Sequence, residues 1–197
     1  MKRTQMCTEI RPARDGDRAA IGDFFAGLSP ATRYLRFFTG AAPSTAAALR
    51  ALCGEGGDVD VIVAAEGTAV VGHAMAVHRA RPDGIRSADV GVVVADGRQD
   101  MGIGTALLRM LTGRAVARGA SVAVMDVLAE NQRVLALIRR RWPDASYDRR
   151  GLSVTVHAGL WGGAAPAPGE LARRRNGRRG DGGRQAARHP AARVPVG

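Results

Sequence analysis

The residues best suited to chemistry lie in the segment 99–105, where two glycines are separated by one residue. The valine-rich run 90–95 before it is typical of a buried strand, and apolar residues at helical spacing follow it as far as Gly119, a common helix-ending residue. The segment is therefore predicted to be a loop that opens a helix. The first helical turn has N–H groups without partners in the helix, and glycines let an anion reach them. We expect this loop to bind a phosphate group.

Two common phosphate-binding loops do not fit this segment. A Walker loop is excluded because no Gly-Lys-Ser/Thr follows. For a Rossmann loop, Asp126 stands at a suitable distance, but Leu107 replaces the third glycine and 96–101 is too long for that tight turn. An ordinary turn that needs two glycines stays open on the pattern alone.

The segment resembles the acyl-CoA pyrophosphate loop of the GNAT superfamily of N-acyltransferases. The pattern in that superfamily is Arg/Gln-x-x-Gly-x-Gly/Ala, and Gln99, Gly102 and Gly104 match it. The run 92–96 before the loop and Asn131 at the start of the next predicted helix also match. At the level of predicted elements the resemblance extends over roughly residues 8 to 158.

A second segment, 28–38, narrows the resemblance to bacterial Pat-type protein-lysine acetyltransferases, where a similar segment lies near the acceptor side. The resemblance therefore implies that the acceptor side includes Arg33, Tyr34, Arg36 and Phe37. Physical reasoning alone favours an ordinary amphipathic helix that is capped by a serine and has a proline at its first position.

The resemblance implies an α/β (α+β) fold. Its sheet would be mixed and mostly antiparallel, with six to seven strands, a central parallel pair that splays apart, and about four flanking helices. Apolar patterns predict strands at 9–12, 60–66, 69–78, 90–95, 122–128, 146–149 and 152–157. They predict helices after Asp17, Ser29, Gly104 and Asn131. The histidines at 73 and 78 are expected at the surface, on opposite faces of one strand.

The implied activity is acetyl-CoA-dependent N-acetyl transfer to a primary amine, by direct attack on the thioester in a ternary complex. Backbone at Val92 and Val94 would pair with the pantetheine, and a backbone N–H there would polarise the thioester carbonyl. Asn131 would contact the pantetheine arm, and Asp89 would be the general base, acting through a water. The pyrophosphate would rest on Gln99, Asp100, Met101, Gly102, Ile103, Gly104 and Thr105.

The loop departs from the family pattern at Asp100 and Met101, where a glycine and a basic residue are usual. An acid beside a pyrophosphate is repulsive unless a cation such as Arg98 or Arg109 offsets it. Ile138 stands where many members have a tyrosine, although Pat-type enzymes commonly lack it too. Three functions therefore stay open. They are a protein-lysine acetyltransferase, which we favour, a small-molecule amine acetyltransferase, and a catalytically weak acyl-CoA-binding regulatory module.

The chain is expected to comprise a GNAT domain, 1–159, and a disordered basic tail, 160–197, that is rich in Arg, Gly, Ala and Pro. The tail carries +6 of the net charge of +11, which could bring it to nucleic acid or another polyanion. A solvated appendage is the simpler interpretation, and its deletion should leave stability and CoA affinity nearly unchanged. No run is long enough for a membrane span, the two cysteines form no CxxC, and no cluster has metal spacing. We expect a cytoplasmic protein without a metal; its oligomeric state stays open.

Overall fold

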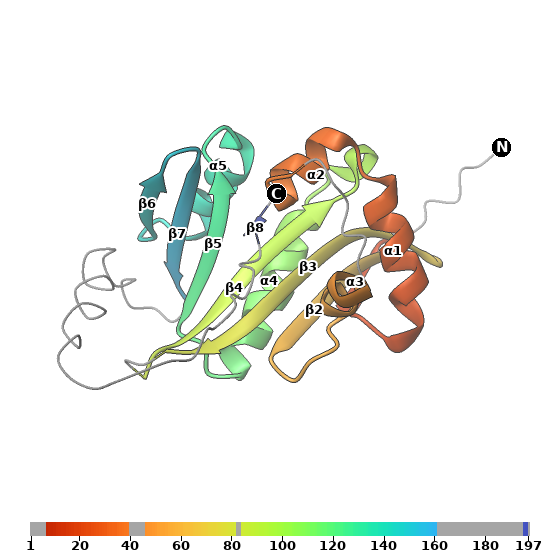
Figure 1. Cartoon of the computed structure of the whole chain (residues 1–197), viewed down its shortest axis with the longest axis horizontal. Helices are drawn as coiled ribbons and strands as arrows, with labels where there is room; N and C mark the ends of the chain where they lie inside the picture. Colours follow the sequence, from red (N-terminus) through yellow and green to blue (C-terminus); the bar gives the residue numbers. More distant parts are fainter. Residues whose placement is uncertain (1–6, 40–45, 82–83, 161–194, 197) are drawn as a thin grey trace, which may run out of the picture.

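The computed structural model describes residues 7–39, 46–81, 84–160 and 195–196, and one twisted sheet forms its centre (Figure 1). The seven strands of its main path lie in the order β1-β2-β3-β4-β5-β7-β6. All neighbours on this path are antiparallel except β4 and β5, which are parallel. The strands are β1 (Glu9–Pro12), β2 (Val59–Glu66), β3 (Ala69–Ala80), β4 (Arg86–Val94), β5 (Val122–Leu128), β6 (Ser146–Arg150) and β7 (Ser153–Gly159).

Helices cover both faces of the sheet (Figure 1). One face packs against α4 (Ile103–Ala117) and α5 (Gln132–Arg141), and the other against α1 (Arg18–Gly27), α2 (Pro30–Phe37) and α3 (Ala46–Leu52). Because side chains alternate along a strand, β4 contributes to the hydrophobic cores on both faces of the sheet. Val90 and Val92 pack on the α4 face, and Val93 packs on the α1 face. Short 3₁₀ turns precede α1 (η1, Asp15–Asp17) and follow β4 (η2, Asp96–Arg98).

The predicted mixed sheet with a central parallel pair is confirmed. Helix α3 was not predicted, because its short sequence, AAALRAL, shows little amphipathic contrast. Of the predicted tail, the structure describes Leu160 and the short strand β8 (Pro195–Val196), which pairs with β5. The rest of the predicted tail, 161–194 and 197, lies outside the described residues.

The parallel pair separates part-way along its length. β4 and β5 pair only where Ser87–Asp89 faces Val122–Val124. Beyond this, β5 pairs on one edge with β7 along its whole length. Strand β8 must therefore lie on the other edge, which faces β4, where it pairs with Asp126 and Val127. The separation leaves the β5-facing backbone edge of β4 without a paired strand after Asp89.

The alternation of backbone bonds shows which residues of β4 face that separation. Ala95, just after β4, donates its N–H to the carbonyl of Val71 in β3 at 2.9 Å. At the other end of β4, the carbonyl of Arg86 accepts from the N–H of Ser121, the residue before β5. In an antiparallel ladder the N–H and C=O of one residue point to the same side, and successive residues alternate. The backbone groups of Val92 and Val94 therefore point toward β5. These are the positions at which the family resemblance implies pairing with the pantetheine.

The histidines of β3 do lie on opposite faces, but the expectation that both are surface residues was wrong for His73. That side chain is fully buried, packs against Phe25, and has Nε2 2.8 Å from the carbonyl oxygen of Leu52. Burial lowers the pKa of His73 to about 4, so the ring is neutral at pH 7 and donates from Nε2. His78 instead has Nε2 2.9 Å from the carboxylate of Asp60.

Candidate functional site

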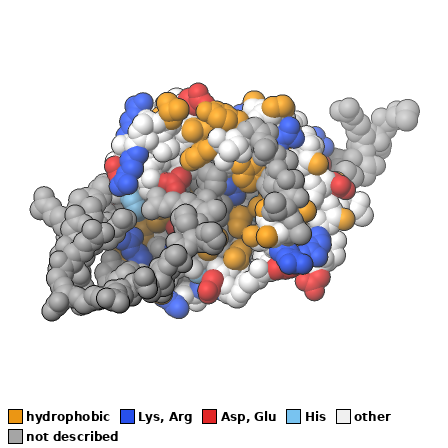
Figure 2. Space-filling view, in the orientation of Figure 1, with side chains coloured by type: hydrophobic (Ala, Val, Ile, Leu, Met, Phe, Trp, Pro, Cys, Tyr) orange, Lys and Arg blue, Asp and Glu red, His pale blue; other side chains and the backbone are white. Residues whose placement is uncertain are grey.

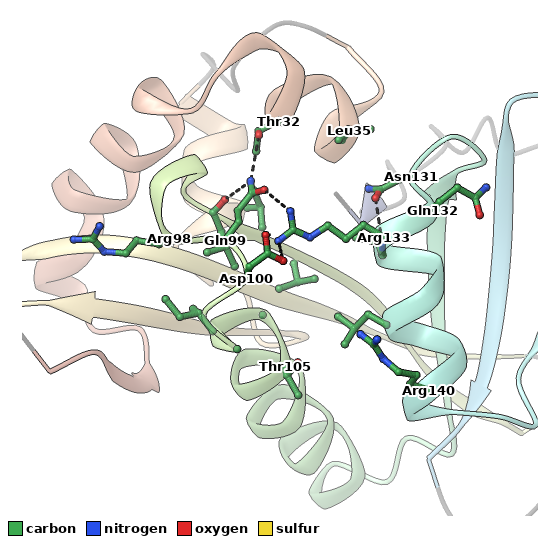
Figure 3. A pocket seen from close by; sticks show the side chains of 18 of the residues that line it. Thr32, Leu35, Arg98, Gln99, Asp100, Thr105, Asn131, Gln132, Arg133 and Arg140 are labelled. Carbon is green, nitrogen blue, oxygen red and sulfur yellow. Dashed lines mark hydrogen bonds and ion pairs between the residues drawn. The ribbon is translucent and has the colours of Figure 1, made fainter.

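A cavity of about 570 Å³ opens where β4 and β5 separate (Figure 3). Its walls come from the end of β4, the following loop, the first turn of α4, one side of α5, and α2. The residues that line it are Thr32, Leu35, Val92, Val93, Val94, Arg98, Gln99, Asp100, Gly102, Ile103, Gly104, Thr105, Glu130, Asn131, Gln132, Arg133, Val134, Leu137 and Arg140. In the orientation of Figure 2, hydrophobic side chains gather near the middle of the visible face and most charged ones lie toward its edges.

The loop before α4 has two residues in the left-handed backbone region. Gly102, the N-cap of α4, has φ of 78°, and Asp100 has φ of 65°. Glycine adopts this conformation freely, and aspartate is among the few other residues that tolerate it. This explains why the family pattern has a glycine where this chain has Asp100. The first backbone bond within the helix runs from Ala106 N–H to the carbonyl of Gly102, so the three preceding N–H groups have no helical partner.

Gly104 leaves space at the cavity rather than in the core. A Cβ at this position would meet only Val94 Cγ2, at 3.7 Å, which is an ordinary contact. The helix therefore does not need glycine there to pack against the sheet. The absent side chain keeps the first turn of α4 open to the cavity, as a phosphate-binding turn requires.

Asn131 caps α5 and offers a free donor to the same cavity. Its Oδ1 accepts from the N–H of Val134 at 3.2 Å. Its Nδ2 is buried and has no hydrogen-bond partner among the residues that the structure describes. Because a buried donor without a partner is costly, this amide nitrogen fits a ligand that presents a carbonyl or hydroxyl oxygen.

The cations around the loop are arranged differently from the sequence expectation. Arg98 is held by Glu66, with its Nη2 2.9 Å from the carboxylate, and Arg109 does not line the cavity. Asp100 is instead paired with Arg133, from the first turn of α5. Sequence reasoning missed Arg133 because no local spacing links the two residues; only the fold brings α5 beside the loop.

Helix α2 forms one side of the cavity and is fixed to the loop. Ser29 caps it by accepting from the N–H of Thr32 at 3.1 Å. Asp96 accepts from Ser29 N–H at 3.0 Å, from Ser29 Oγ at 2.7 Å and from Thr32 Oγ1 at 2.7 Å. Gln99 Nε2 donates to Val94 O at 3.2 Å. The residues of α2 that line the cavity are Thr32 and Leu35, three apart on one helical face, which sequence reasoning did not single out.

The four acceptor-side residues predicted from the sequence lie outside the lining of this cavity. Tyr34 is exposed, and Arg33 donates to the carbonyl of Ala26 at 3.2 Å. Phe37 packs against Phe25, with ring centroids 5.6 Å apart. Arg36 is fully buried, so any effect it has on an acceptor would act through the position of α2.

Asp89, the predicted base, lies where β4 still pairs with β5, and it does not line the cavity. Its side chain is buried on the α1 face of the sheet, four residues from Val93 along the strand. Arg79 of β3 donates from Nε to its carboxylate at 2.5 Å. The structure thus places this acid in an ion pair, near the point where the strands separate.

A family model described as the acetyltransferase (GNAT) family matches residues 31–141, more than half of the chain. The chain belongs to the GNAT acetyltransferases. The match begins in α2 and ends in α5, and so contains the whole loop and the parallel pair. No curated protein sequence gives a significant match.

Solved structures similar to this GNAT chain confirm its fold. The GNAT domain of S. lividans PAT has a TM-score of 0.68 and 20% identity, over 77% of this chain and 90% of that one. The protein yncA from Salmonella typhimurium, solved with its cofactor acetyl-CoA, has a TM-score of 0.61 and 22% identity, over 82% of this chain and 99% of that one. A phosphinothricin acetyltransferase from Sinorhizobium meliloti, also with acetyl-CoA, has a TM-score of 0.61 and 22% identity, over 83% and 94%.

Among the residues that the structure describes, no helix combines the length and apolar character needed to cross a membrane. In the same part of the chain, no three acidic, histidine or cysteine side chains gather closely enough to hold a metal ion.

Proposed function

We propose that this chain is an acetyl-CoA-dependent N-acetyltransferase that acts on a primary amine, with a protein lysine as the acceptor class. The observation that carries the proposal is the shared cavity. It joins the free first turn of α4, the unpaired backbone edge of β4 and the unpartnered amide of Asn131. These groups suit a pyrophosphate, an amide-containing arm and a carbonyl oxygen, which are the chemical parts of an acyl-CoA thioester.

The residues that would hold acetyl-CoA divide along the cavity. The N–H groups of 103–105 suit the pyrophosphate, and the edge of β4 at Val92 and Val94 suits the pantetheine amides. An N–H at that edge would also stabilise the negative charge that develops on the thioester oxygen. The unpartnered Nδ2 of Asn131 would donate to the arm.

The reaction joins the amine nitrogen to the thioester carbonyl carbon and breaks the carbon–sulfur bond, releasing the thiol of CoA. An amine near neutral pH carries a proton that must leave before attack. Asp89 is the proposed acceptor of that proton. Because its carboxylate lies outside the cavity lining, a bridging water would carry the proton to it.

Two observations support a protein lysine as the acceptor. The resemblance of 28–38 to a Pat-type segment favours a protein lysine, and the anchoring of α2 to the loop gives that segment a fixed place beside the cavity. A small amine would fit the same chemistry. A binding module with little turnover is favoured by one specific observation, the strand β8 on the β4-facing edge of β5.

The first experiment separates binding from turnover. Calorimetry should show acetyl-CoA binding, and release of CoA thiol should accelerate when lysine peptides are added. Gly104→Val should abolish binding while unfolding stays cooperative, because a branched side chain would block the open first turn of α4. Undiminished affinity in the folded variant would remove the loop from the assignment. Acetyl-lysine mass spectrometry after incubation with cell extract would then identify the acceptors, and binding without turnover would favour the regulatory module.

A further inference from the structure

One ion pair crosses the mouth of the cavity. Asp100 belongs to the loop that follows β4, whereas Arg133 is the second residue of α5, beyond β5. The Arg133 guanidinium reaches from α5 to the Asp100 carboxylate through Nη2 and donates from Nη1 to Gln99 Oε1 at 3.2 Å (Figure 3). All three residues line the cavity. The contact therefore joins the two sides of the separation between the strands.

This ion pair is well placed to be exchanged. The Arg133 side chain is 53% exposed and that of Asp100 is 80% exposed. A pair so open to water contributes little to stability, so opening it costs little. The pyrophosphate of an acyl-CoA carries more charge in total than one carboxylate. It also offers more acceptor oxygens to the planar guanidinium, which can bind them through two parallel hydrogen bonds.

The guanidinium also lies where a phosphate is expected. It contacts two residues of the loop whose following turn presents the free N–H groups of α4. The other cation of the loop, Arg98, is already bound to the buried carboxylate of Glu66 by three contacts of 2.9–3.0 Å. Among the described lining residues, Arg133 is thus the cation that touches the phosphate loop from across the cavity.

We propose that Arg133 is a phosphate-binding residue of this cavity, and that Asp100 is an internal anion that occupies it until a ligand pyrophosphate takes its place. The inference rests on the proposed function, because it assumes that the ligand is an acyl-CoA. In this arrangement Asp100 competes with the ligand pyrophosphate for Arg133, and its main effect is not direct repulsion of the ligand. Arg140 lines the cavity two helical turns further along α5 and is assigned no part in the exchange.

The test is a double-mutant cycle measured by calorimetry with CoA. Arg133→Gln should weaken binding by about 10- to 100-fold, the effect of losing charge-assisted hydrogen bonds. Asp100→Asn removes the charge but keeps a residue that tolerates the left-handed backbone, and it should tighten binding about threefold or more. In the Arg133→Gln background, Asp100→Asn should have no further effect, because the residue it competes for is gone.

Two parts of CoA and a control variant show which group of the ligand Arg133 contacts. Pantetheine, which lacks phosphates, should bind wild type and Arg133→Gln equally, and 3′-dephospho-CoA should show the same loss as CoA if the pyrophosphate is the partner. Arg141→Gln removes the same charge from the same helix, but that side chain stacks on Trp142 outside the cavity lining, so CoA affinity should not change. Thermal unfolding checks that each variant is folded.

The outcomes separate this inference from the proposed function. Failure of the wild type to bind CoA would remove the proposed function. Wild-type binding with unchanged affinity in Arg133→Gln would overturn only the present inference. A gain from Asp100→Asn that persists undiminished without Arg133 would show direct repulsion, and would overturn the exchange.

Discussion

Asp89 shows how one residue can be assigned a role by sequence and constrained by structure. Its carboxylate is buried and bound to Arg79 at 2.5 Å, on the α1 face of the sheet. A buried carboxylate without a partner would be costly, and the guanidinium of Arg79 supplies that partner. The ion pair therefore holds Asp89 near the separation of β4 and β5 but outside the cavity lining.

Substitution of Asp89 tests whether it accepts the proton of the amine. Asp89→Ala should keep CoA affinity but lower kcat about 10²- to 10⁴-fold, the usual contribution of a general base. Asp89→Glu should match or exceed the wild-type rate, because the longer side chain reaches nearer the cavity. Steady-state kinetics across pH on folded variants provides the measurement. Equal kcat in all three forms would leave deprotonation to solvent or another group.

The buried ring of His73 should make the stability of the native protein depend on pH. Burial lowers the pKa of His73 to about 4, below the value of about 6.5 in an unfolded chain. As pH falls below 6.5, the unfolded chain binds a proton that the native ring does not, so native stability is lost. The loss should approach 1.4 kcal/mol per pH unit, about the value for one proton, and level off near pH 4.

Chemical denaturation at pH 7, 6 and 5 measures this effect against His73→Gln, which keeps a donor for the Leu52 carbonyl but does not titrate. The variant should lose less stability than the wild type over this range. The carboxylates with lowered pKa, such as that of Asp60, contribute at lower pH and do not interfere. Parallel pH profiles would contradict the assignment.

At the scale of elements, α2 and the loop after β4 act as one unit. Asp96 receives three hydrogen bonds from the start of α2, two from its N-cap Ser29 and one from Thr32 in its first turn. Desolvation raises the pKa of Asp96, but the hydrogen bonds from Ser29 and Thr32 outweigh it, so the pKa lies below its ordinary value. The charged acid also suits the N-terminus of a helix. Helix α2 thus takes its position from the loop that precedes α4.

Asp96→Asn should loosen this attachment, because an amide offers one acceptor oxygen in place of two. We expect KM for a lysine peptide to rise severalfold and stability to fall by about 1–2 kcal/mol, with CoA affinity nearly unchanged. Asp23→Asn, an exposed position on α1, is the matched control. A rise in KM for acetyl-CoA alone would place the effect on the loop rather than on α2.

The elements were largely predictable from the sequence, whereas the contacts between them were not. Alternation and helical spacing located β5 at 122–128 as the structure has it, and Ser29 and Asn131 cap helices as expected. Gly102 and Gly104 identified the loop because backbone conformation is a local property. Arg133, Thr32 and Leu35 escaped notice because their importance depends on how α5 and α2 pack, which no local pattern encodes.

At the scale of the whole molecule, the end of the chain returns to the centre of the sheet. Strand β8 pairs with Asp126 and Val127 on the edge of β5 that faces β4, although 161–194 separate it from the domain in sequence. On sequence alone, deletion of 160–197 is expected to leave CoA affinity unchanged. The observed pairing changes that expectation, because β8 lies in the separation that acetyl-CoA is proposed to enter.

Deletion of 195–197 should therefore raise CoA affinity or speed its association, while thermal stability changes little because so short a strand forms few bonds. Stopped-flow binding and calorimetry, with the full-length chain and a 160–197 deletion for comparison, supply the measurement. Identical binding in all three forms would show that β8 does not compete with the ligand.

The incomplete pairing of β4 has a consequence for how its amide protons exchange with solvent. Central strands of a sheet usually exchange slowly along their whole length, because both neighbours hold their N–H groups. In β4 the groups that point to β3 should be protected, whereas those of Val92 and Val94 lack a β5 partner and should exchange faster. Protection should thus alternate from residue to residue, and an acyl-CoA that pairs with this edge would make the fast members slow.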